Sequence, residues 1–143
     1  MIAPLPVPIT HKSRANVNGV HARLQLSDPK PVFYFYFDPE PAAPAGRAPL
    51  PYRVTGPNQY TLARFEVKSD HREMEVGAIN MRAMTQGIPA KFMVEFDFEK
   101  VSPGIYKVWP RTNLKPGEYC FVPTPGSPYL GGQLMDFGIT GGQ

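Results

Sequence analysis

The chain has 143 residues, enough for one domain whose core needs neither a metal nor a disulfide. Its 18 prolines and 13 glycines indicate many turns, and 12% aromatic residues argue against disorder. The net charge of +3 comes from scattered lysines and arginines rather than a basic run, so we expect no nucleic-acid partner.

The sequence carries no local pattern for a disulfide, a metal or a membrane span. Cys120 is the single cysteine, and we interpret it as a buried thiol. The three histidines lack metal-ligand spacing, and the glycine pairs lack the spacing of a phosphate loop, so we expect no metal and no cofactor. No apolar stretch approaches the roughly 18 residues of a membrane helix. The first residues lack a basic leader, which favours the cytoplasm unless the chain is the processed product of an exported protein.

Residues 1–10 are predicted to form an extended arm, because proline fixes φ and here alternates with apolar residues. In a strand-like geometry Leu5, Val7 and Ile9 share one face, and they are our candidate partner-binding residues. Docking of this arm on its own domain, docking on a neighbouring copy and a free tail are three open alternatives. Residues 11–143 are predicted to form a single domain.

Alternating apolar residues predict the first strands of that domain. One strand is expected over Val20–Leu26 and a second over Val32–Phe37. In the second strand the phenylalanines should face the core and Tyr34 and Tyr36 the other side. Residues 38–51 contain five prolines and are predicted to form a long loop.

The middle of the chain continues with strand patterns. Tyr60–Lys68 is expected to form one strand, with Thr61, Ala63, Phe65 and Val67 on one side. Helix and strand signals compete over residues 71–86, and we favour two short strands there. Residues 92–99 alternate apolar and acidic side chains, which predicts one strand with a solvated ladder of Glu95, Asp97 and Glu99.

The end of the chain holds a repeated Pro-Gly-x-Tyr motif, at residues 103–106 and 116–119. Each copy predicts a tight turn followed by a strand, and together they suit consecutive antiparallel strands. A last strand is expected over Leu134–Ile139. We therefore predict an all-β chain, a single antiparallel β-sandwich of eight or nine short strands with little or no helix.

The second motif, with its preceding Leu114 and Lys115, resembles the Leu-x-Pro-Gly…Tyr corner of immunoglobulin-like and fibronectin type III modules. The resemblance implies a β-sandwich and a structural corner of Leu114, Pro116, Gly117 and Tyr119, in which the Tyr119 hydroxyl bonds to nearby backbone. This chain has one residue fewer between glycine and tyrosine than fibronectin type III modules. The same segment with the closing Asp136-Phe137-Gly138 also resembles uncharacterised bacterial proteins, and implies no activity.

Two groups of residues are candidates for chemistry or binding. The dense polar segment Asp70–Glu73 combines carboxylates with an imidazole, but such residues are also typical of a turn between strands, which we favour. Outward aromatic residues are the stronger signal, because flat rings near hydrogen-bond donors are typical of sugar and protein contacts. The candidate ligand-binding residues are Tyr34, Tyr36, Trp109 and Arg111.

The sequence thus favours a non-catalytic structural or assembly module that contacts proteins, including other copies of itself, through its arm and sheet edges. A carbohydrate- or peptide-binding module that uses the outward aromatic residues is the first alternative. A hydrolase on a sandwich scaffold is the second, and no catalytic residue is assigned.

Overall fold

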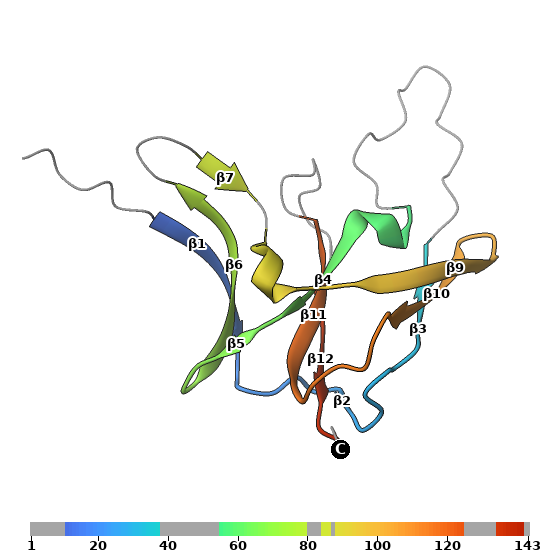
Figure 1. Cartoon of the computed structure of the whole chain (residues 1–143), viewed down its shortest axis with the longest axis horizontal. Helices are drawn as coiled ribbons and strands as arrows, with labels where there is room; N and C mark the ends of the chain where they lie inside the picture. The colour runs from blue at the N-terminus through green and yellow to red at the C-terminus, as the bar shows by residue number, and fades with distance from the viewer. Residues whose placement is uncertain (1–10, 38–54, 80–83, 87, 125–133, 142–143) are drawn as a thin grey trace, which may run out of the picture.

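The computed structural model describes residues 11–37, 55–79, 84–86, 88–124 and 134–141. In this part the chain is all-β, as predicted, with three open sheets (Figure 1) and two single-turn 3-10 helices, η1 (Pro57–Gln59) and η2 (Ala90–Phe92). Three sheets, one of them with a parallel pair of strands, do not confirm the predicted two-sheet antiparallel sandwich. The arm with Leu5, Val7 and Ile9 and the proline-rich segment 38–51 lie outside the described residues.

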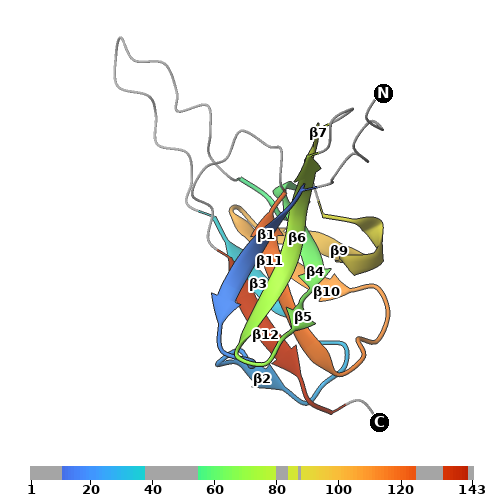
Figure 2. The ribbon, with the colours of Figure 1, turned by 90° about the vertical axis from the view of Figure 1, so that its left-hand side faces the viewer.

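The strands form sheets A, B and C. Sheet A has the order β1 (His11–Asn18), β6 (His71–Ile79), β5 (Glu66–Val67), and β7 (Met84–Gln86) also pairs with β6. Sheet B has the order β2 (Gln25–Leu26), β12 (Met135–Ile139), β11 (Gly117–Pro123), β4 (Tyr60–Arg64), β8 (Met93–Val94). Sheet C has the order β3 (Phe33–Tyr36), β10 (Ile105–Pro110), β9 (Phe96–Ser102). Sheet B stands between the other two, with sheet A in front of it when the molecule is turned by 90° (Figures 1 and 2).

Both faces of sheet B are buried, each in its own core. The larger core, between sheets B and C, consists of Phe35, Leu62, Val108, Leu114, Tyr119, Phe121, Phe137 and Ile139. The smaller core, between sheets A and B, consists of Ala63, Phe65, Met74, Ile88 and Cys120. Strand β11 contributes to both, because successive side chains of a strand point to opposite faces. The middle strands of sheet B therefore bury consecutive residues along the chain, rather than every second residue.

Several predicted strands are confirmed. Strand β3 buries Phe35 in the core and exposes Tyr34 and Tyr36, as the alternation predicted. Residues 71–86 do contain two strands, β6 and β7, of which β6 has nine residues. The last strand, β12, begins one residue later than predicted.

The first predicted strand is wrong over most of its length. Only Gln25 and Leu26 of the segment 20–26 are in a strand, and Leu24 is 49% exposed rather than buried. The backbone N–H of Ala22 donates to the Glu118 carboxylate, and the Leu24 carbonyl accepts from the Gly138 N–H at 2.8 Å, so single hydrogen bonds hold this segment to sheet B ahead of the short ladder of β2. The sequence reasoning also missed β1, whose polar residues give no apolar alternation.

Two predicted strands are each divided between two sheets. Tyr60–Lys68 leaves sheet B after Arg64 and enters sheet A at Glu66, so that Val67 is exposed instead of facing the core with Phe65. The segment 92–99 likewise leaves sheet B after Val94 and enters sheet C at Phe96, and Phe98 is 44% exposed. Alternation shows which residues are apolar but not which sheet receives them.

The two Pro-Gly motifs have different conformations. Gly104 has a φ of 74° and turns the β9–β10 hairpin, as predicted. Gly117 has no positive φ and begins β11 instead, and β10 and β11 belong to different sheets rather than pairing. The corner hydrogen bond predicted for the second motif is present, because the buried Tyr119 donates its hydroxyl proton to the Lys115 carbonyl oxygen at 2.6 Å.

Candidate functional site

The outer face of sheet C brings together three of the four candidate ligand-binding residues. Tyr34 lies opposite Lys107 in the β3–β10 register, and Trp109 follows two residues along β10 on the same face. Tyr36 lies opposite Ile105. The inner face of the same strands packs on the larger core, so these residues point away from it. Tyr34 is 53% exposed and Tyr36 is 73% exposed, while Trp109 is half-buried.

The fourth candidate, Arg111, is engaged in an ion-pair network next to this face. Its guanidinium bonds to Asp97 at 3.0 Å and to Glu95 at 3.0 Å. The hydrogen bond to Asp97 is the largest of the interactions that raise the pKa of Arg111. Two rungs of the predicted carboxylate ladder are thus paired with this one arginine, whose Nε, Nη1 and Nη2 groups already donate to carboxylates.

Lys107 adds a cation to the aromatic face. Its ammonium group lies 5.6 Å from the centroid of the Trp109 ring, a cation–π distance. On its other side Lys107 is opposite Glu99 of β9. The outer face of sheet C therefore combines exposed tyrosines at one edge with a cation-covered indole in the middle.

A second polar cluster lies on the strand pair β5–β6. The backbone N–H of Lys68 donates to the His71 carbonyl at the turn between these antiparallel strands. The turn interpretation of Asp70–Glu73 is correct for Asp70 alone, because His71, Arg72 and Glu73 belong to β6. The His71 ring lies between two carboxylates, at 2.6 Å from Asp70 and 3.3 Å from Glu73. These hydrogen bonds, first that to Asp70, raise the pKa of His71.

The carboxylates of this cluster are held in their ionised form. The pKa of Asp70 is lowered by its hydrogen bond to His71. Burial alone would raise the pKa of Glu73, but hydrogen bonds from His71 and Arg14 outweigh it and lower the pKa. Lys68 lies 3.5 Å from Glu73 as well. Both ring nitrogens of the imidazole thus face carboxylates, which favours its protonated form.

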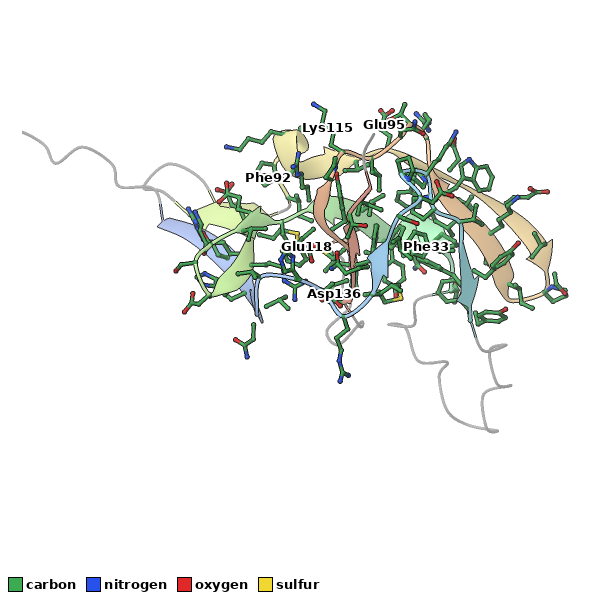
Figure 3. All side chains as sticks on the ribbon, turned by 90° about the horizontal axis from the view of Figure 1, so that it is seen from below. Phe33, Phe92, Glu95, Lys115, Glu118 and Asp136 are labelled. Carbon is green, nitrogen blue, oxygen red and sulfur yellow. The ribbon has the colours of Figure 1, made fainter. Side chains whose placement is uncertain are left out.

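A buried charge network joins sheets A and B, and the sequence reasoning missed it. Arg72, 2% exposed, donates to Asp136 at 2.8 Å and to the carbonyls of Asn18 and Gly19. Its guanidinium also lies 3.5 Å from Glu118, which is 4% exposed. Figure 3 shows Glu118 and Asp136 near each other at sheet B, and Phe33 on the opposite side of that sheet. One signal was present in the sequence: Arg72 lies two residues before the apolar Met74, so in a strand both side chains point to the same face.

Cys120 is buried in the smaller core, as interpreted from the sequence. Its sulfur lies 3.9 Å from that of Met74, and burial is the main cause that raises its pKa to about 12. The thiol is therefore protonated at neutral pH, the opposite of what a nucleophilic cysteine requires.

Within the described ranges, no group of three or more His, Cys, Asp or Glu residues is arranged to hold a metal ion. The same part of the chain contains no helix long and apolar enough to cross a membrane. Comparisons with protein-family models, with curated proteins and with solved structures found no match to this chain.

Proposed function

We propose that this protein is a non-catalytic assembly module that contacts other proteins through the outer face and the edges of its sheets. The observation that carries the proposal is the exposure of Tyr34 and Tyr36 beside Trp109 on the outer face of sheet C. Tyrosine and tryptophan contribute large contact areas at low entropic cost, and they are enriched where interfaces bind most strongly.

The two residues best suited by type to act as a nucleophile or a base, Cys120 and His71, support a non-catalytic role. Cys120 is buried with a raised pKa, and His71 has carboxylates at both ring nitrogens. Neither group is poised as a nucleophile or a general base.

Sedimentation of the full chain over a range of concentrations tests the proposal. We expect species heavier than one chain of 15.9 kDa, and fewer of them for Tyr36→Ser. The matched control is Leu24→Ser, which removes a 49% exposed apolar side chain that lies outside the strands and should leave assembly unchanged. A chain that sediments as a monomer at every concentration, and that crosslinks to no protein in extracts of its own cells, would contradict the proposal.

The arm is a second element of this proposal. Strand β1, which follows residues 1–10 in the sequence, is an edge strand of sheet A. Deletion of residues 2–9 should abolish part of the assembly while the fold is retained, if Leu5, Val7 and Ile9 bind a neighbouring copy. Lower thermal stability with unchanged assembly would instead assign the arm to its own domain.

Carbohydrate binding is a second candidate function, favoured by the alignment of Tyr34, Tyr36 and Trp109 on one exposed face. Aromatic rings on a flat face are suited to stacking on sugars. A glycan array with the wild type and Trp109→Ala tests it. Binding that is lost in the variant would support this function, and an array without any signal would reject it.

A further inference from the structure

Strand β3 is an edge strand of sheet C and carries an uncharged sequence. In the described residues it pairs with β10 alone. The segment Val32–Phe37 consists of one valine and five aromatic residues, without charge, proline or glycine. High β-propensity with low charge is typical of segments that pair readily with another strand.

The backbone of β3 points its free hydrogen-bonding groups toward this open edge. The Phe37 N–H donates to the Gly104 carbonyl at 2.7 Å, so the backbone groups of Phe37 point toward the neighbouring hairpin strand. In an antiparallel ladder the direction alternates from residue to residue. Phe35 therefore bonds to β10, and the N–H and C=O groups of Tyr34 and Tyr36 point away from it.

The other edges in the described part of the chain are protected against such pairing. Strand β9 has Asp97, Glu99 and Lys100 and a register shift next to its turn. Strand β1 has Lys12 and Arg14, also with a register shift. Strands β2, β5 and β8 have two residues each, and β7 has three. Strand β3 is the edge without a charge or a bulge.

We propose that β3 pairs antiparallel with β3 of a second copy, centred on Phe35, so that two C sheets become one six-stranded sheet. This inference rests on the proposed assembly function and names its partner. A two-fold axis midway between the two Phe35 residues relates the strands, and because Phe-Tyr-Phe-Tyr-Phe of residues 33–37 is symmetric about Phe35, each residue faces one of its own kind. Tyr34 then lies opposite Tyr36 of the second copy, and the reverse pair forms as well.

This register agrees with the direction of the backbone groups. Tyr34 and Tyr36 are the residues whose N–H and C=O groups face the edge, and they become the hydrogen-bonded pairs on either side of Phe35. The two-fold axis is perpendicular to the sheet, so each side chain stays on its own face. The exposed tyrosines of the two copies form one continuous aromatic row, and the phenylalanines continue the inner face.

Two double variants with the same positions changed test the partner and the register together. Tyr34→Glu with Tyr36→Lys places each new carboxylate opposite a new cation of the second copy, and should retain the dimer. Tyr34→Glu with Tyr36→Glu places carboxylates opposite carboxylates, and should shift sedimentation to the mass of one chain. We expect circular dichroism to show that both variants fold, because the two side chains are exposed in the single chain and the residue at position 34 lies opposite Lys107.

Tyr36→Pro gives an independent measurement. The N–H of Tyr36 points to the open edge, so a proline at this position removes no bond to β10 and is tolerated. In the dimer, the same change removes one hydrogen bond from each copy, two in all. We expect a folded monomer. A wild-type dimer that persists equally in all three variants would overturn the edge pairing and leave the assembly function standing, whereas a wild-type chain that is always monomeric would overturn both.

Discussion

Tyr119 connects a short sequence motif to a measurable interaction. Its ring stacks on Phe137 in the larger core, at 5.7 Å between centroids, and its hydroxyl reaches back four residues to Lys115. The motif therefore fixes where the chain enters β11, although Gly117 needs no special backbone conformation.

Replacement of Tyr119 by Phe should lower the free energy of unfolding by about 1 kcal/mol, because one hydrogen bond is lost while the ring packing is kept. Urea denaturation measures the change. Tyr34→Phe, at an exposed position, is the matched control and should leave the free energy of unfolding unchanged. Equal stability of the two variants would contradict the role of the Tyr119 hydroxyl.

His71 should make stability depend on pH. Its pKa in the folded chain lies above the ordinary 6.5, so its contribution is complete below about pH 6.5 and is lost as the pH rises through the raised pKa. The lowered pKa values of Asp70 and Glu73 have the opposite sign, so their contributions are lost as the pH falls through those values.

We therefore expect the urea midpoint of the wild type to fall between about pH 6 and about pH 8, and the fall to be smaller in His71→Asn. Titration of the imidazole by NMR gives the pKa directly, and Asp70→Asn should lower it. An imidazole pKa that does not respond to this substitution would show that the Asp70 hydrogen bond is not its main cause.

At the scale of elements, sheets A and B are joined by charge as well as by apolar contact. Arg72 from β6 contacts Asp136 of β12 and Glu118 of β11, and its guanidinium lies 5.4 Å from the centroid of the Phe65 ring. Every buried side-chain nitrogen and oxygen in the described residues has a hydrogen-bond partner, so removal of one member leaves others unsatisfied.

Substitution of Arg72 by Leu should cost about 3–5 kcal/mol, because it leaves the buried Glu118 carboxylate without its arginine partner and the carbonyls of Asn18 and Gly19 without their donor. The control is Arg111→Leu, which breaks exposed ion pairs with Glu95 and Asp97 and should cost about 0–1 kcal/mol. Chemical denaturation of both variants compares the two costs. A small effect of Arg72→Leu would mean that the apolar core alone holds sheets A and B together.

Sequence patterns identified elements better than their assembly. The Phe-Tyr alternation of β3 and the Pro-Gly hairpin at Gly104 are local, and both were predicted correctly. Strand β1 was not, because its mostly polar sequence lacks apolar alternation and forms a strand by pairing with β6. The passage of one apolar run between two sheets, at Phe65 and again at Glu95, depends on packing partners far away in the sequence.

The candidate site was predictable to a similar extent. Alternation placed Tyr34 and Tyr36 outside the core, and the pairing of β3 with β10 puts them on the same face of sheet C as Trp109. It did not predict that Arg111 is held by two carboxylates, since Asp97 and Glu95 are 14 and 16 residues away in the chain. Likewise, the partners of Arg72 lie in strands that only the fold brings together.

At the scale of the whole molecule, three open sheets leave edges that a protein must protect or use. Charges, bulges or short length protect the other described edges, while β3 presents an uncharged aromatic strand beside an exposed aromatic face. Strand β3 is therefore the edge through which we expect this protein to contact a second copy.

Amide hydrogen exchange at low and high protein concentration tests this claim most directly. The amides of Phe35 and Phe37 bond toward β10 and should be protected at both concentrations, while those of Tyr34 and Tyr36 face the open edge. We predict that Tyr34 and Tyr36 exchange fast in dilute solution and become protected at high concentration. Fast exchange of these two amides at every concentration would contradict the account.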